Sequence, residues 1–225
     1  EQALEAIRLR ALKDRDRVGE SVASLAMAQL AQKEGDLEKA ERHFRRVRTL
    51  SPQNTEALDF FEHLYRTTGD AKRLLVALSQ RLATTEGKEA VRIALEIASL
   101  AEGPLATPER AIEAYQRVLA VQPDHAQATA ALERLYHGQG QWHALRDLLD
   151  GEARRMLPHA GRSTSIAEQA VAVLERIAAL HDATGVLPSA DDQLEAYRQI
   201  VQVAPLHPTA FAAVRAHLAL IDDPA

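Results

Sequence analysis

The sequence contains no cysteine, which excludes disulfide bonds and every metal or redox site built on thiolates. Aromatic residues make up only 4% of the chain, so its core has to come mainly from Ala, Leu, Val and Ile. No apolar run approaches the roughly 20 residues of a membrane-spanning helix. The formal net charge is −5, and nucleic-acid binding needs a basic face instead. We therefore expect neither a membrane span nor a nucleic-acid partner.

The rest of the composition is typical of a folded protein, with 46% apolar and 26% charged residues among 225. The first residues are charged and helical in pattern, unlike a signal peptide. The chain begins with Glu1 rather than Met, which leaves open that it is a segment of a longer protein. We expect a bacterial protein in the cytoplasm, while a periplasmic location also fits a chain without cysteine.

One stretch of the chain repeats itself 71 residues later. Residues 40–78 are echoed by residues 111–149, with matching Ala40 and Ala111, Phe44 and Tyr115, Val47 and Val118, Pro52 and Pro123, Leu64-Tyr65 and Leu135-Tyr136, and Gly69 and Gly140. Part of the pattern returns at 193–214. Self-similarity on this scale predicts an array of stacked units.

Residues 21–54 show what one unit contains. Apolar residues recur at helical spacing on both sides of Gly35-Asp36, and Pro52 ends the second run. Glycine favours the left-handed backbone of a helix end, and Asp36 is placed to cap the next helix. Asn54 is placed in the same way before the following helix. The unit is predicted to be two helices joined by a tight turn.

At this spacing the unit resembles a tetratricopeptide repeat, through Ala28, Gly35, Ala40, Phe44, Val47 and Pro52. The resemblance implies a right-handed all-α solenoid of antiparallel hairpins. It places repeats at about 21–54, 55–87, 88–125, 126–158 and 163–206 of a single domain, with a preceding helix or cap in 1–20 and a terminal helix in 207–225.

Regular and degenerate repeats alternate along the chain. The second and fourth repeats carry Leu74 and Leu145 where the family has a small residue, and the second has no closing proline. In the third repeat Thr107 is a predicted helix cap before Pro108, and in the fifth Ser189 and Asp192 resemble a capping box.

Catalytic patterns are missing from the sequence. It has no His-Glu-x-x-His sequence, no phosphate-binding glycine loop and no Gly-x-Ser-x-Gly turn. We interpret Glu62-His63 with Tyr65-Arg66 as a solvated helix face, and Trp142 and Phe60-Phe61 as core. The basic residues Arg42, Arg45 and Arg46 share a helix face, which we interpret as solvated, with docking of an acidic partner as the alternative. The sequence predicts no catalytic residue, no cofactor and no metal site.

In the family that this chain resembles, the first helix of each hairpin lines a concave channel. The resemblance assigns one stripe of each first helix to that channel: Val22, Leu25, Gln29, Gln32 and Lys33; Glu56, Asp59, His63, Arg66 and Thr67; Glu89, Arg92, Glu96 and Ser99; and Gln127, Ala130, Arg134 and His137. Some members grip a C-terminal carboxylate with Lys, Asn and Arg. Here Lys33 is the one match in its repeat, while Glu56, Asp59 and Glu96 would repel a carboxylate.

Two functions stay open on the sequence. The first is a non-catalytic scaffold or adaptor that binds a polypeptide partner in the channel. The second is a structural spacer or self-associating array within a larger assembly. An enzyme or small-molecule sensor would need His and carboxylate side chains that converge in one pocket.

Overall fold

The structure is a computed structural model that describes residues 1–184 and 190–222 of the chain. Helices occur throughout this described part, and no strand does. They are α1 (Gln2–Lys13), α2 (Arg17–Glu34), α3 (Leu37–Leu50), α4 (Thr55–Thr68), α5 (Ala71–Leu82), α6 (Gly87–Glu102), α7 (Pro108–Val121), α8 (Ala126–Gly138), α9 (Trp142–Ala160), α10 (Thr164–Thr184), α11 (Ala190–Val203) and α12 (Pro208–Asp222). The predicted cap Ser189 lies outside the described residues.

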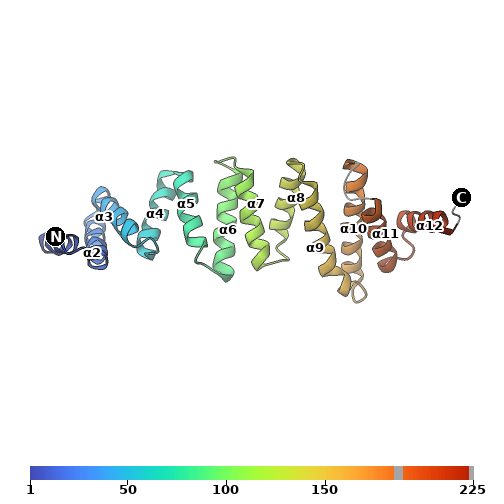
Figure 1. Cartoon of the computed structure of the whole chain (residues 1–225), viewed down its shortest axis with the longest axis horizontal. Coiled ribbons are helices and arrows are strands. Elements are labelled where there is room, and N and C mark those ends of the chain that lie inside the picture. The colour runs from blue at the N-terminus through green and yellow to red at the C-terminus, as the bar shows by residue number, and fades with distance from the viewer. Residues whose placement is uncertain (185–189, 223–225) are drawn as a thin grey trace. The chain divides into compact units, whose positions relative to one another are not determined.

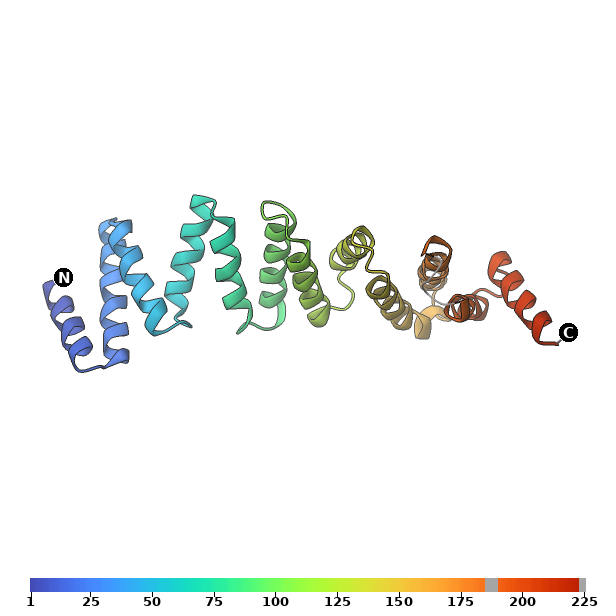
Figure 2. The ribbon, with the colours of Figure 1, turned by 45° about the horizontal axis from the view of Figure 1, so that its top comes forward.

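The chain divides into two parts by its internal contacts, residues 1–121 and 122–225. In the first part α2 packs with α3, α4 with α5, and α6 with α7, while α1 covers α2 (Figure 1). In the second part α8 packs with α9 and α10 with α11, while α12 follows α11 (Figure 2). Each part is built from consecutive helical hairpins, and the predicted all-α hairpin fold is confirmed.

The hairpin turns have the local chemistry that the sequence predicts. Gly35 and Gly69 end their helices with φ of 79° and 70°, a conformation that glycine adopts without steric cost. Asp36 and Asn54 accept hydrogen bonds from the backbone of the next helix, at 3.0 Å in both cases. Thr107 precedes α7 as predicted, but its buried hydroxyl has no hydrogen-bond partner among the residues that the structure describes, so its side chain does not cap the helix.

Small and aromatic side chains fill the core of the first part. Ala28, Ala40 and other alanines are fully buried where helices meet, which lets the backbones approach closely. Phe44 stacks on Phe60 with ring centroids 4.3 Å apart, and Phe60 meets Phe61 edge to face. Phe60 and Phe61 are therefore core residues, as predicted.

The interior of the second part is mainly aliphatic, with Tyr136 of α8 as a buried aromatic residue. Leu132, Leu149 and Leu174 are almost completely buried on α8, α9 and α10. Trp142 at the start of α9 is half-buried, and its ring meets His137 of α8 edge to face with centroids 5.1 Å apart. Trp142 thus packs against the preceding helix as expected, but it is only half-buried, so the predicted core position is met only in part.

Candidate functional site

The predicted channel residues fall into three groups in the structure. In the first part, Gln29, Gln32, Glu56, Asp59, His63 and Thr67 lie along α2 and α4, and Arg66, Glu89, Arg92 and Glu96 lie on α4 and α6. In the second part, Arg134 and His137 lie on α8 with Ala130, and Gln127 is exposed nearer the start of that helix. Lys33 is exposed on the last turn of α2.

A groove of about 580 Å³ runs between α2, α3 and α4 in the first part. We call it the acidic groove, and its lining is Gln32, Leu37, Phe44, Glu56, Asp59, Phe60, His63, Leu64 and Thr67. Its floor is apolar, because Phe44 and Phe60 supply their stacked rings and Leu64 lies beside them. Leu37 at the start of α3 is 59% exposed, so part of the apolar surface is open to solvent.

The polar rim of the acidic groove carries two carboxylates and no Lys or Arg. Nε2 of Gln29 donates to Oε2 of Glu56 at 2.6 Å, a bond that links α2 to α4. The Asp59 side chain is 64% exposed. Thr67 donates its hydroxyl to backbone carbonyls of its own helix and so offers a partner only acceptor capacity. The rim favours a cationic or hydrogen-bond-donating group.

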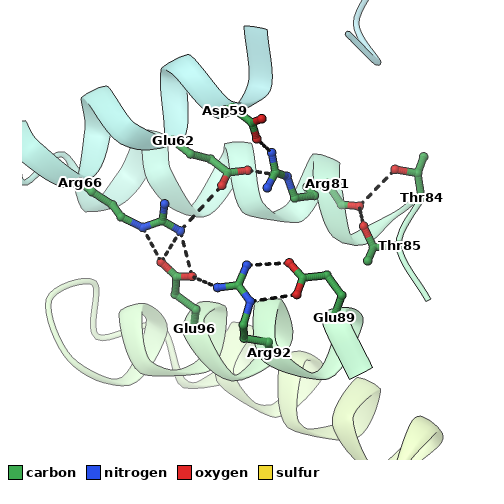
Figure 3. A network of polar contacts seen from close by, with 9 residues as sticks. All are labelled: Asp59, Glu62, Arg66, Arg81, Thr84, Thr85, Glu89, Arg92 and Glu96. Atoms are coloured by element: carbon green, nitrogen blue, oxygen red, sulfur yellow. Dashed lines mark hydrogen bonds and ion pairs between the residues drawn. The ribbon is translucent and has the colours of Figure 1, made fainter. Parts of the chain in front are cut away.

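A chain of ion pairs continues from this rim across α4, α5 and α6 (Figure 3). Arg81 of α5 pairs with Asp59, and its Nε lies 2.8 Å from Oε1 of Glu62. Arg66 lies 3.7 Å from the other oxygen of Glu62 and grips Glu96 of α6 through two hydrogen bonds of 2.9 and 3.0 Å. Two-pronged arginine–carboxylate contacts have directional geometry, so Arg66 fixes α4 against α6.

Arg92 and Glu89 close the far end of this network on α6. The Arg92 guanidinium donates to both oxygens of Glu89 at 2.6 and 3.0 Å. These hydrogen bonds lower the pKa of Glu89 and raise that of Arg92. Both side chains are more than half exposed, so solvent screens the pair and it adds little stability.

Glu62 is the buried centre of the network. Its side chain is only 3% exposed, and burial raises the pKa of its carboxyl group, against the opposing influence of Arg81 and Arg66. Oε1 has no correctly aligned hydrogen bond within the described residues, although Arg81 is close. The predicted solvated face is therefore wrong for Glu62 and for Tyr65, which is buried in the core, while His63 and Arg66 are exposed.

The second part has a smaller groove of about 360 Å³ between α8, α9 and α10. Arg134 and His137 line it together with Leu145 and Leu149 of α9. Glu133 of α8 pairs with Arg176 of α10 across it. Here the rim holds two arginines and one carboxylate, the opposite balance to that of the acidic groove.

Two of the four arginines of α3, Arg46 and Arg48, contact neighbouring helices. Arg46 donates to Oε1 of Glu20 at 2.8 Å, and that carboxylate is 4% exposed on α2. The Arg48 guanidinium lies 4.6 Å above the centre of the Phe61 ring, at cation–π distance. Arg42 and Arg45 are exposed. Their exposure fits a solvated face and a docking site for an acidic partner equally well, whereas Arg46 and Arg48 contact α2 and α4.

Sequence reasoning missed the two residues on which the network depends, Glu62 and Arg81. Arg81 lies 22 residues after Asp59 and belongs to a second helix, which the channel stripes leave out. The one available signal for Glu62 was its place one helical turn after Leu58 and one before Arg66. In the described part of the chain no three His, Asp or Glu side chains gather as metal ligands, and no helix there is long and apolar enough to cross a membrane.

Comparisons with known proteins give structural likeness only. No family model and no curated protein matches the chain. Among solved structures, MamA is 18% identical over 81% of this chain and 91% of its own, with a TM-score of 0.37. YrrB, a tetratricopeptide-repeat protein with an unusual peptide-binding site, is 13% identical over 92% and 97%, with a TM-score of 0.38. PilF of Pseudomonas aeruginosa is 14% identical over 96% of both chains, with a TM-score of 0.36. The resemblance to tetratricopeptide-repeat proteins concerns the hairpin fold, which the helices and turns above establish.

Proposed function

We propose that this chain is a non-catalytic interaction module that holds an extended segment of a partner protein in the acidic groove. The observation that carries the proposal is the combination of an apolar floor, exposed to solvent at Leu37, with an acidic rim on one face of α2 to α4. Mixed surfaces of this kind are typical of binding sites, where apolar area supplies affinity and polar groups supply orientation.

The lining of the groove defines the chemistry of the segment. Leu37, exposed above the buried rings of Phe44 and Phe60, offers contact to one apolar side chain, while Glu56 and Asp59 offer contact to a neighbouring Lys or Arg. A free C-terminal carboxylate would approach the same two carboxylates without a cation in the lining to receive it. We therefore expect an internal peptide segment with an apolar anchor beside a basic residue.

The anchor alone is too weak to hold a partner. Complete burial of a Leu or Phe side chain contributes about 1.5–3 kcal/mol, whereas a micromolar complex needs about 8 kcal/mol. The rest has to come from contacts along the first helices, where the network of α4 and α6 presents ordered charges. The ordered side chains lose less entropy on binding than mobile ones would.

Selection from a displayed library of random peptides tests this proposal. Peptides that bind the wild type should combine an apolar residue with an adjacent Lys or Arg, and fluorescence anisotropy should show weaker binding to Leu37→Ser and to Glu56→Gln. Val76 is 54% exposed on α5 outside the groove, and Glu113 is exposed on α7, so Val76→Ser and Glu113→Gln are matched controls. Selected peptides that are acidic, or that bind all four variants equally, would refute the proposal.

Self-association is a second candidate function, favoured by apolar side chains exposed on α1 and on α12. Ile7, Leu9 and Leu12 of α1 are 46–55% exposed, and Phe211 and Leu218 of α12 are both 51% exposed. Exposed apolar surface of this kind promotes pairing with another copy. Light scattering over a hundredfold range of concentration tests it, and a mass that stays monomeric throughout would leave a spacer role instead.

A further inference from the structure

Arg81 joins the acidic groove to the interior of the hairpin array. It lies on the last turn of α5, where its carbonyl accepts hydrogen bonds from the hydroxyls of Thr84 and Thr85 (Figure 3). These bonds hold the end of the helix in place. From there its side chain, 22% exposed, reaches back over α4 to Asp59 and Glu62.

Asp59 belongs to the groove and to this network at once. Its carboxylate lines the groove and is mostly exposed, yet it already has a cationic partner in Arg81. A Lys or Arg of a bound peptide would therefore meet a carboxylate that is partly neutralised. The attraction between Asp59 and that residue therefore depends on how strongly Arg81 pairs with another carboxylate instead.

Glu62 is the competing partner of Arg81. The two carboxylates and the one guanidinium carry a net charge of −1 when Glu62 is ionised and of zero when it is protonated. We propose that Arg81 is the specificity-determining residue of the acidic groove. The competition between its ion pairs with Asp59 and with the buried Glu62 sets the preference of the groove for a basic peptide residue. This inference rests on the proposed peptide-binding function.

The surroundings of Glu62 make this competition between the two ion pairs of Arg81 dependent on pH. Asp59 and Arg66 of α4, Arg81 of α5 and Glu96 of α6 are the charged groups that act on it. Because burial raises its pKa, Glu62 takes up a proton at a less acidic pH than an exposed glutamate does. Arg81 then pairs with Asp59 alone, and the preference for a basic residue falls as the pH falls. His63 also lines the groove, so pH measurements belong in a His63→Gln background.

The test compares a selected peptide with its analogue in which norleucine replaces the basic residue. The dissociation constant of the norleucine analogue divided by that of the basic peptide measures the preference for the charge, and we call this quotient the ratio. Arg81→Gln frees Asp59 and should raise the ratio about two- to five-fold, the size of an exposed charge pair. In Glu62→Gln, Asp59 is the remaining carboxylate partner of Arg81, so Asp59 is more fully neutralised and the ratio should fall toward one.

Arg73→Gln is the matched control, because Arg73 lies on the same helix, is 68% exposed and pairs with Asp70 instead. It should leave the ratio unchanged, which separates the action of Arg81 from a general loss of positive charge. If Arg81→Gln does not fold with Glu62 left charged, Arg81→Gln/Glu62→Gln frees Asp59 without that buried charge and should also raise the ratio.

The outcomes distinguish this inference from the proposed function. Opposite shifts for Arg81→Gln and Glu62→Gln, with no shift for Arg73→Gln, would support it. Bound peptide with an unchanged ratio in Arg81→Gln, or an equal change in Arg73→Gln, would overturn the inference and leave the proposed function standing. Failure of the wild type to select any peptide would overturn both.

Discussion

Replacement of Glu62 by Gln should stabilise the protein at alkaline pH, although it removes a charge that lies between two arginines. Glutamine keeps the shape of the side chain and removes the cost of a buried charge. Neither arginine loses its last partner, because Arg66 still grips Glu96 with two hydrogen bonds and Arg81 still pairs with Asp59. Each of the two arginines therefore keeps a carboxylate partner after the substitution.

The size of the effect follows from the burial of the carboxylate. Buried ion pairs often add nothing to stability once desolvation is counted, and a buried group without a hydrogen bond costs about 1–3 kcal/mol. Oε1 of Glu62 is such a group, but the new amide of glutamine also points donors toward two guanidinium groups. We expect a net gain in the free energy of unfolding of about 1 kcal/mol at pH 8.

The gain should shrink as the pH falls. The folded-state pKa of Glu62 is raised above its ordinary value of 4.5, so between that value and the raised one the folded protein binds more protons than the unfolded chain. The wild type therefore loses stability as the pH rises through this window, and Glu62→Gln does not. Below pH 4.5 the group is protonated in both states, and the two proteins should differ least.

Urea denaturation followed by circular dichroism at pH 4 and pH 8 measures this difference. Effects of other titrating groups cancel between wild type and variant, since both contain them. Glu113→Gln is the control, because that carboxylate is 64% exposed on α7 and its variant should stay within about 0.5 kcal/mol at both values. A loss of 2 kcal/mol or more at pH 8 would show that the ion pairs outweigh desolvation, and a difference that does not change with pH would show that folding does not raise the pKa of Glu62.

Three further substitutions test the packing of the hairpins by the same denaturation assay. Leu135→Ala empties a buried site on α8 and should cost about 2–5 kcal/mol, so a loss below 1 kcal/mol would place that side chain outside the core. Arg46→Gln leaves the buried carboxylate of Glu20 with only a distant cation and should cost about 1–3 kcal/mol, whereas an unchanged midpoint would show that Arg46 is merely solvated. Gly69→Ala places a side chain at φ of 70° and should cost about 1 kcal/mol, while Gly138→Ala, in open space on α8, should cost nothing; equal effects would refute the left-handed turn.

The helices and turns were predictable because their determinants are local. Gly35, Asp36 and Asn54 act on backbone groups a few residues away, so their roles follow from spacing. The repeat at 71 residues then places equivalent helices in both parts of the chain without any knowledge of tertiary structure. Thr107 shows the limit of this reasoning, since its position is right and its hydroxyl still makes no cap.

The candidate site was predictable only where a single helix presents it. The helical period brings Glu56, Asp59 and His63 to one face of α4, and the structure places all three along one groove. Helical period does not determine how a helix is rotated against its neighbours, and that rotation decides that Glu62 is buried. The contribution of Arg81 depends in addition on how α5 packs against α4, which brings Arg81 to Asp59 and Glu62. Both facts come from tertiary packing.

The irregular repeats are where each part departs from a plain array of hairpins. Hairpin α4–α5 carries Leu74 in place of a small residue, and it also carries the acidic rim and Arg81. Hairpin α8–α9 carries Leu145 in the same way, and Leu145 itself lines the smaller groove of the second part. Regular repeats keep the small residues that the rules of close helix packing favour, although the first of them still contributes Leu37 and Phe44 to the acidic groove. Since sequences tend to break such rules where function requires it, the degenerate second and fourth repeats are the places where substitutions should change binding before they change the fold.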